Sequence, residues 1–152
     1  MEKVKEIQIK RGEVSDLNSI TDLVARYYQE EGKIDPFSVI PQKDFLAKAI
    51  EKKLKDDKRY FYFLFYLNGE VFGLTQSVVF GNGLAELILV YVLPQFRGQG
   101  LGKKILSETL KELKLKGAKT IRAEIRNNNF VSHRLFSRFS LQPYSTIYVF
   151  KI

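Results

Sequence analysis

The sequence predicts an α/β fold: a mixed, mostly antiparallel, twisted sheet with one parallel strand-helix-strand crossover, flanked by about four helices. Two observations lead to this prediction. Between residues 60 and 93, two turns rich in Asn and Gly separate three apolar, β-prone runs, a pattern typical of antiparallel strands. The third run passes through a glycine-rich turn into an amphipathic helix and then an alternating run at residues 119–126, which predicts a parallel crossover.

The N-terminal part reads as one strand and two helices. Residues 5–10 alternate, with Ile7 and Ile9 on one face, and predict the first strand. Ser15 and Asp16 are suitable caps for a helix that follows, and Gly32 is its predicted end. Its apolar residues at helical spacing are Leu17, Ile20, Leu23, Val24, Tyr27 and Tyr28. Residues 33–41 predict a loop, and the buried side of the second helix is expected to carry Phe45, Leu46, Ala49, Ile50 and Leu54.

The middle of the chain reads as a meander of strands. Residues 60–67 and 70–80 are joined by Asn68-Gly69, the dipeptide most typical of a two-residue hairpin. Gly81-Asn82-Gly83 then turns the chain into residues 84–93, which are nearly all apolar. A continuous apolar run is expected where both faces of a strand are covered.

The last third predicts a helix, a strand, a short helix and one or two final strands. The first of these helices is expected to end at Gly117 and to bury Leu101, Ile105, Leu106, Leu110 and Leu113. Residues 119–126 alternate as a strand, and residues 127–129 can cap a short helix bearing Val131, Leu135, Phe136 and Phe139. Residues 141–152 predict the final strands. The full predicted order is β-α-α-β-β-β-α-β-α-β.

Composition limits the class of protein. A chain of 152 residues with 45% hydrophobic residues predicts one globular domain over residues 1–152. The chain has no cysteine, which excludes disulfides and a cysteine nucleophile, and its single histidine, His133, makes a metal site unexpected. The charged N-terminus does not resemble a signal peptide, and no apolar run is long enough for a membrane span, so we expect a soluble cytoplasmic protein.

The turn Arg97-Gly98-Gln99-Gly100-Leu101-Gly102 predicts an anion site. Glycines at alternate positions allow a tight turn with uncovered N–H groups, and the helix that follows adds its own unpaired N–H groups and positive dipole end. Lys103 and Lys104 add positive charge. The spacing fits neither a Walker loop nor a dinucleotide fingerprint.

The pattern R-x-x-G-x-G, preceded by V-x-P at Val92 and Pro94, resembles the acetyl-CoA-binding motif of the GNAT N-acetyltransferases. The order of elements is also similar to the GNAT fold over nearly the whole chain. The resemblance implies acetyl-CoA as co-substrate, no metal, and direct acetyl transfer to an amine acceptor. The cofactor-binding residues that it implies are Tyr91, Val92, Arg97, Gly98, Gln99, Gly100, Leu101, Gly102, Lys103 and Asn129.

Acetyl transfer requires a base, because an ammonium has no lone pair with which to attack. Glu86 is the expected catalytic base, since it is the only ionisable residue in an otherwise apolar strand and stands where many GNAT enzymes carry a glutamate. Burial beside apolar neighbours would raise its pKa toward a useful range. The alternative is a solvated glutamate near the start of the strand.

One position departs from the GNAT pattern. Where the family often carries a tyrosine that protonates the leaving thiolate, this chain has Phe136, and Ser140 replaces a glycine. The general acid is therefore left open, with its candidates Ser132, His133, Ser137, Tyr91, Tyr144 and Tyr148. The resemblance places the acceptor wall at residues 27–39 and 144–148.

Two other functions are alternatives to acetyl transfer. An acyl-CoA-binding or sensing domain with weak catalysis would also fit Phe136. The net charge of +8 raises the question of nucleic-acid binding, but the basic residues are spread over several helices without a recognition motif, so no specific nucleic-acid partner is expected. The identity of the amine acceptor is not predicted, and the resemblance also allows a homodimer.

Overall fold

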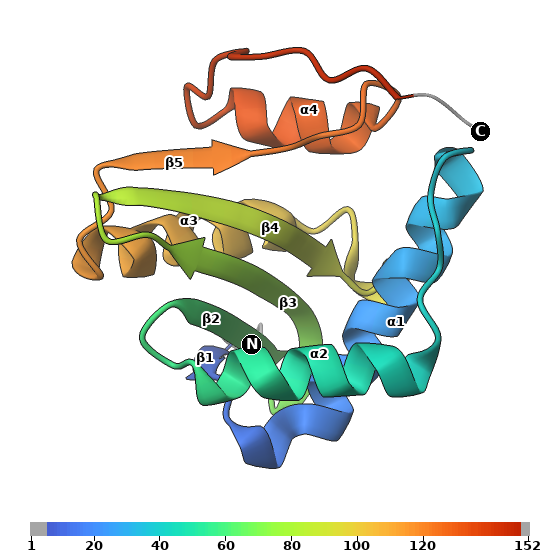
Figure 1. Ribbon diagram of the computed structural model, residues 1–152, viewed down its shortest axis with the longest axis vertical. Helices are drawn as coiled ribbons and strands as arrows, with labels where there is room; N and C mark the ends of the chain where they lie inside the picture. Colours follow the sequence, from blue (N-terminus) through green and yellow to red (C-terminus); the bar gives the residue numbers. More distant parts are fainter. Residues whose placement is uncertain (1–5, 150–152) are drawn as a thin grey trace, which may run out of the picture.

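A computed structural model describes residues 6–149, and its centre is a five-stranded sheet with the order β1-β2-β3-β4-β5 (Figure 1). Neighbouring strands are antiparallel except β4 and β5, which are parallel, so the predicted mixed α/β fold is confirmed. The strands are β1 (Ile7–Arg11), β2 (Tyr60–Leu67), β3 (Glu70–Val79), β4 (Leu84–Val92) and β5 (Thr120–Ala123). The helices are α1 (Leu17–Ile34), α2 (Lys43–Lys55), α3 (Leu101–Leu115) and α4 (Phe130–Ser137), with short 3-10 turns η1 (Val14–Asp16) and η2 (Pro94–Phe96).

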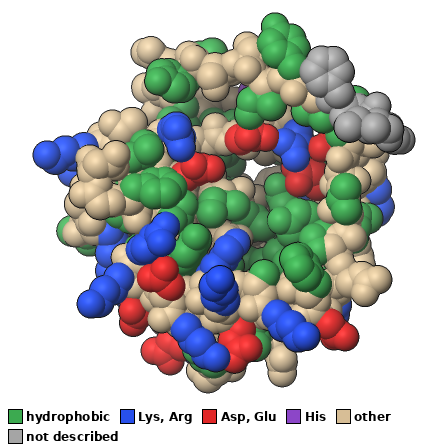
Figure 2. All heavy atoms as spheres, viewed as in Figure 1, with side chains coloured by type: hydrophobic (Ala, Val, Ile, Leu, Met, Phe, Trp, Pro, Cys, Tyr) green, Lys and Arg blue, Asp and Glu red, His purple; other side chains and the backbone are tan. Residues whose placement is uncertain are grey.

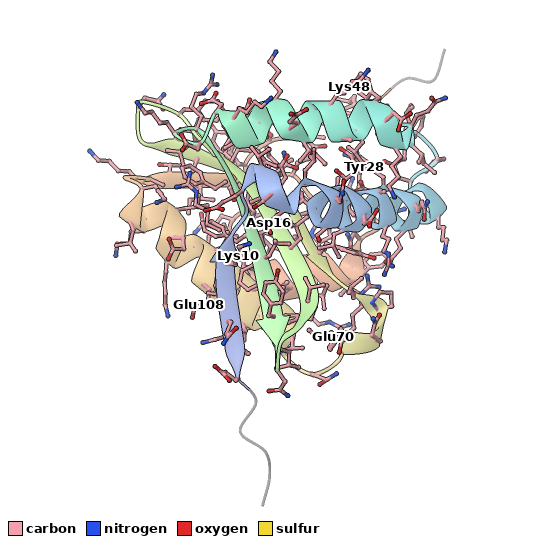
Figure 3. All side chains as sticks on the ribbon, turned by 90° about the horizontal axis from the view of Figure 1, so that it is seen from below. Lys10, Asp16, Tyr28, Lys48, Glu70 and Glu108 are labelled. Atoms are coloured by element: carbon pink, nitrogen blue, oxygen red, sulfur yellow. The ribbon has the colours of Figure 1, made fainter. Side chains whose placement is uncertain are left out.

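The helices form layers on the two faces of the sheet. Figures 1 and 3 show α1 and α2 together on one face and α3 on the other, with α4 beside β5. Leu89 and Tyr91 of β4 belong to the core under α1 and α2, whereas Leu87 packs with Leu106 and Phe136 on the opposite face. Burial of these apolar faces is the main force that holds the layers together.

The two faces of β4 are exchanged at a β-bulge. Leu87 pairs with Ser77 and Leu89 pairs with Gln76, so Ile88 is an extra residue without a counterpart on β3. Without the bulge, residues 87 and 89 would point to the same face, because side chains alternate along a strand. The bulge therefore places the side chains of Leu89 and Tyr91 on the face toward α1, where the candidate site lies.

A buried polar contact joins β3 to α3. The hydroxyls of Thr75 and Thr109 lie 3.0 Å apart, and the Thr109 hydroxyl also donates to the carbonyl oxygen of Ile105 at 2.8 Å. Both threonines are fully buried. This pair satisfies two polar groups that would be costly to bury alone.

The entry into α1 is fixed by a second polar contact. The Lys10 ammonium donates to the Asp16 carboxylate at 2.7 Å, and the other Asp16 oxygen accepts from the backbone N–H of Glu13 at 2.9 Å. Figure 3 shows Lys10 on β1 beside Asp16 at the start of α1. These bonds join the first strand to the first helix.

Helix α1 is longer than predicted. It continues through Gly32 and ends at Ile34, because the following residue, Asp35, precedes Pro36 and adopts an extended conformation. A Cβ at Gly32 would lie 3.1 Å from Ile40, so the glycine permits close packing of the segment between α1 and α2. The predicted stop at Gly32 was therefore wrong.

The buried side of α2 is narrower than predicted. Leu46, Ile50 and Leu54 form the buried row at four-residue spacing, as a helix requires. Phe45, which was expected on this side, is 70% exposed. It lies one residue, or about 100°, away from Leu46 around the helix, outside the stripe that faces the sheet.

The predicted C-terminal strands are absent from residues 141–149, which carry no strand in the part of the chain that the structure describes. Pro143 has no N–H to donate to a ladder, and Tyr144, Ile147 and Tyr148 are exposed. Figure 1 shows this segment passing over α4 and away from β5. The predicted first residue, Lys5, and residues 150–152 lie outside the described residues.

Candidate active site

The site begins where β4 and β5 separate. The two strands pair only from Leu84–Thr120 to Leu87–Ala123, whereas β3 pairs with β4 as far as Val92. Within the described sheet, residues 88–92 of β4 thus have no strand partner on the β5 side. Figure 1 shows the two strands side by side at their starts and diverging toward the end of β4. This separation also explains why β5 stops at Ala123 although the alternating pattern continues to Arg126.

A cavity opens in this gap. It is bounded by both strands, by α1 and by α4, and its lining residues are Tyr27, Glu31, residues 87–90, residues 123–126, Asn129, Ser132 and Phe136. Figure 2 shows this face hollowed near its centre, with acidic and basic side chains above the hollow and hydrophobic side chains below it. The cavity thus offers an apolar wall and a charged border.

The glycine-rich turn lies at the end of β4. Gly98 and Gly100 have φ values of +77° and +76°, in the left-handed region that other residues adopt only with strain. Gly100 is the N-cap of α3, and the first backbone bond of the helix is made by the N–H of Lys104 to the Gly100 carbonyl. By helix geometry, the N–H groups of Leu101, Gly102 and Lys103 have no partner within α3.

Gly102 has a different role from the other two glycines. It is helical, and a Cβ there would make only ordinary contacts with Leu135 of α4 and Val92 of β4. The expectation that all three glycines shape the turn thus holds for Gly98 and Gly100. Gln99 lies between those two in the same turn, and Lys103 is exposed just beyond it.

Arg97 and Tyr91 are both held by Glu30 of α1. The Tyr91 hydroxyl donates to one Glu30 oxygen at 2.6 Å, and Arg97 Nη2 donates to the other at 2.6 Å. Arg97 Nε donates to the Val92 carbonyl at 2.8 Å. Burial, followed by the hydrogen bond to Glu30, raises the pKa of the Tyr91 phenol above its ordinary value.

The upper border of the cavity is an ionic network around Arg126. Arg126 Nε donates to the buried carboxylate of Asp35 at 2.7 Å, and Arg126 Nη1 donates to Glu124 at 2.5 Å. The other Asp35 oxygen accepts from the backbone N–H of Phe37 at 2.9 Å. The network fixes the segment after α1 against the end of β5. No local pattern in the sequence indicates the bond between Asp35 and Arg126, because the two residues are 91 positions apart.

Two side chains of α1 face the cavity, and the sequence had placed them only in a predicted acceptor wall. Tyr27 and Glu31 stand one helical turn apart, the spacing at which side chains meet. Burial, together with the hydrogen-bonded carboxylate of Glu31, strongly raises the pKa of the Tyr27 phenol. Tyr144 and Tyr148, the other part of that predicted wall, are exposed and do not line the cavity.

The predicted base, Glu86, lies in the paired part of β4, before the gap. Its side chain accepts from Arg122 Nη2 on β5 at 3.1 Å and is partly exposed. Glu86 precedes Leu87 and so points to the α1 face of the sheet. It is not among the residues that line the cavity.

The start of α4 matches the sequence prediction. The Asn129 side chain caps the helix by accepting from the backbone N–H of Ser132 at 3.1 Å. Asn129, Ser132 and Phe136 line the cavity, and Phe136 is only 7% exposed. Nε2 of His133 lies instead 3.0 Å from the carbonyl oxygen of Arg126. Of the side chains on this helix, Ser132 thus brings a hydroxyl to the cavity, whereas Phe136 brings an apolar ring.

Two further features, a metal-ligand cluster and a membrane-spanning helix, are absent from residues 6–149. No group of three or more His, Cys, Asp or Glu residues there is arranged to hold a metal ion. None of the helices in this range has the length and apolarity needed to cross a membrane.

Comparison with known proteins finds the same arrangement elsewhere. A family model described as the acetyltransferase (GNAT) family matches residues 17–140. A search of curated proteins finds no match. The fold is shared with solved structures at 16–18% sequence identity. At this level of identity the likeness shows the fold and not the substrate.

Three of these structures illustrate the range. An aminoglycoside N-acetyltransferase, AAC(6')-Iy in complex with CoA, has a TM-score of 0.75 at 16% identity, covering 100% of this chain and 98% of its own. An aminoglycoside acetyltransferase from an uncultured soil metagenomic sample, in complex with trehalose, has a TM-score of 0.74 at 18% identity and 96% coverage of both chains. A ribosomal-protein-alanine N-acetyltransferase from Brucella melitensis biovar Abortus 2308 has a TM-score of 0.71 at 16% identity, covering 97% of this chain and 100% of its own.

Proposed function

Because this chain belongs to the acetyltransferase (GNAT) family, we propose that it transfers the acetyl group of acetyl-CoA directly to an amine acceptor. The observation that carries the proposal is the separation of β4 from β5 directly before the glycine turn. It leaves residues 88–90 of β4 without a strand partner on the β5 side at one wall of a cavity, beside a helix N-terminus that attracts anions.

The residues at this site fit the chemical parts of coenzyme A. The diphosphate is anionic, and the start of α3 offers it the N–H groups of residues 101–103, which have no partner within the helix, together with the positive charge of Lys103. The pantetheine arm carries amide groups, which suit the backbone of Tyr91 and Val92 along the edge of β4, apart from the Val92 carbonyl that accepts from Arg97 Nε. Asn129, at the cap of α4, borders the same cavity. When bound there, acetyl-CoA would supply the activated acetyl group.

The chain must then stabilise charge and move two protons. A backbone N–H at the free edge of β4 is suited to polarise the thioester carbonyl as negative charge develops on its oxygen. We propose Glu86 as the base that accepts the amine proton, either directly or through a water molecule, since it lies on the α1 face of β4 two residues before the bulge. The Arg122 partner keeps a positive charge beside the carboxylate.

The proton for the leaving thiolate has a different source from the one the family pattern suggests. Phe136 occupies the wall of the cavity and has no proton to donate. The hydroxyls that the cavity does present belong to Tyr27 and Ser132. The thiol of coenzyme A also has a moderate pKa, so water can supply the proton that the departing thiolate takes up.

The test is a titration of the native chain with acetyl-CoA, followed by a screen of amines for thiol release. The chain contains no cysteine, so every thiol detected by a disulfide reagent comes from coenzyme A. Binding together with thiol release that depends on an amine is the expected result. Binding without acetylation of any amine would instead indicate an acyl-CoA-binding domain, and absence of binding by a folded chain would refute the cofactor site.

A further inference from the structure

Both carboxylate oxygens of Glu30, on α1, accept hydrogen bonds from residues at the end of β4 and the start of the glycine turn. Glu30 Oε1 accepts from the Tyr91 hydroxyl, and Glu30 Oε2 accepts from Arg97 Nη2, each at 2.6 Å. These distances are short, as expected for hydrogen bonds to an ionised group. Although partial burial opposes ionisation, the bonds from Tyr91 and Arg97 keep the pKa of Glu30 below its ordinary value.

The two partners of Glu30 lie in the two segments that should meet the cofactor, the end of β4 and the glycine turn. Tyr91 is in the part of β4 that has no partner on the β5 side, and its ring packs edge-on against Tyr27 in the cavity wall, with centroids 6.1 Å apart. Arg97 opens the glycine turn and donates from Nε to the Val92 carbonyl. The Glu30 carboxylate therefore joins α1, the end of β4 and the start of the turn.

We propose that Glu30 is a positioning residue for the acetyl-CoA site, which fixes the free end of β4 and the glycine turn relative to one another through Tyr91 and Arg97. The inference rests on the function proposed above. Glu30 acts through its two partners and needs no contact with acetyl-CoA itself. Its effect is to order the site before the ligand arrives, which lowers the entropy lost on binding.

This role differs from that of an ordinary surface ion pair. A lone exposed pair holds two flexible side chains and contributes little. Here Arg97 is held at two points, by Glu30 and by the Val92 carbonyl, and its guanidinium lies over the Tyr91 ring at 5.6 Å. The negative charge of Glu30 also opposes the binding of a phosphate. That charge is partly exposed and screened at physiological salt, so we expect the loss of order to outweigh the loss of repulsion.

The experiment compares Glu30→Gln and Glu30→Asp with the native chain by calorimetric titration with coenzyme A at about 0.15 M salt. Gln keeps the length and removes the charge, whereas Asp keeps the charge and is too short for both partners. The control is Asp22→Asn, which removes an exposed acid of the same helix whose ion pair with Lys43 lies outside the site. Thermal unfolding of each variant verifies that it is folded.

Ordering of one long side chain predicts a dissociation constant raised roughly three- to tenfold in both Glu30 variants. The Asp22→Asn chain should bind as the native chain does. With a substrate in hand, KM for acetyl-CoA should rise while kcat stays within about twofold, since Glu30 acts on binding. Glu30→Gln combined with Tyr91→Phe should weaken binding by less than the sum of the two single effects, because the tyrosine acts through the same side chain.

Either of two results would overturn the inference. One is native affinity for coenzyme A in both Glu30 variants, and the other is tighter binding by Glu30→Gln, which would make Glu30 a repelling charge. Should Glu30→Gln be unfolded, the Asp variant decides the matter. Failure of the native chain to bind coenzyme A is a separate outcome, which refutes the proposed function before Glu30 is tested.

Discussion

Substitution of Gly100 by alanine separates the strain in the glycine turn from its role in binding. Gly100 has φ +76°, and a Cβ there would meet nothing within 4 Å, so alanine adds backbone strain without a clash. A left-handed conformation costs an alanine about 1–2 kcal/mol. Alanine also lowers the conformational entropy of the unfolded chain relative to glycine, which offsets part of this cost. In a chain of this length, each kcal/mol lowers Tm by about 2–4 °C.

The effect on coenzyme A should exceed this loss of stability. A shift of the Gly100 backbone moves the unpaired N–H groups at the start of α3, and the loss of one hydrogen bond to a charged group costs about 1.5–3 kcal/mol. We therefore expect the dissociation constant for coenzyme A, measured by calorimetry, to rise about 10- to 100-fold, or roughly 1.4–2.8 kcal/mol.

Gly117 provides a matched control for this substitution. It lies beyond the other end of α3, has φ +92°, and also has open space around its Cβ position. Helix geometry places it about 24 Å from the turn. Gly117→Ala should lose a similar amount of stability and bind coenzyme A normally. Native affinity in Gly100→Ala, or an equal loss of affinity in both variants, would refute the assignment of the turn as the anion site.

Three further substitutions test the base, the core and the start of α1. Glu86→Gln should lower kcat about 10²- to 10⁴-fold in the thiol-release assay, while coenzyme A affinity is retained; unchanged turnover would exclude Glu86 as the base. Thr75→Val removes one buried hydrogen bond to Thr109 and should lower the free energy of unfolding in urea by about 1 kcal/mol, whereas an unchanged midpoint would mean that the pair contributes nothing. Burial opposes ionisation of Asp16, but the hydrogen bonds from Lys10 and from the Glu13 N–H outweigh it and lower the pKa of Asp16 below 3.8. The ionised carboxylate therefore stabilises the folded chain above that pH, and this stabilisation is lost as the pH falls through the lowered pKa. The difference in stability between the native chain and Asp16→Asn should accordingly vanish in acid, and a difference that persists at the lowest pH would contradict this reasoning.

Local signals in the sequence were sufficient for most of the fold. The hairpin at Asn68-Gly69, the apolar strand before the glycine turn, and the Asn129 cap are each determined by neighbouring residues, and the structure confirms all three. The boundaries that failed depend on distant packing. Gly32 stays helical because Pro36 ends the helix and because Ile40 packs closely against the glycine.

The candidate site was harder to predict than the fold, because its parts meet only in three dimensions. The glycine turn follows from its own spacing. By contrast, the binding of Arg97 and Tyr91 by Glu30 joins residues more than 60 positions apart, and no local pattern indicates it. The orientation of β4 was equally hidden, since strict alternation would place Leu87, Leu89 and Tyr91 on one face.

β4 carries, at Ile88, one residue more than its pairing with β3 requires. Deletion of Ile88 would leave Leu87 opposite Ser77 and Leu89 opposite Gln76, so the ladder would become regular and the side chains after it would keep their faces. Leu89 and Tyr91 would still point toward α1, and the hydroxyl of Tyr91 would still reach Glu30. The bulge thus marks a position at which the strand can lose a residue without a change in the orientation of the site.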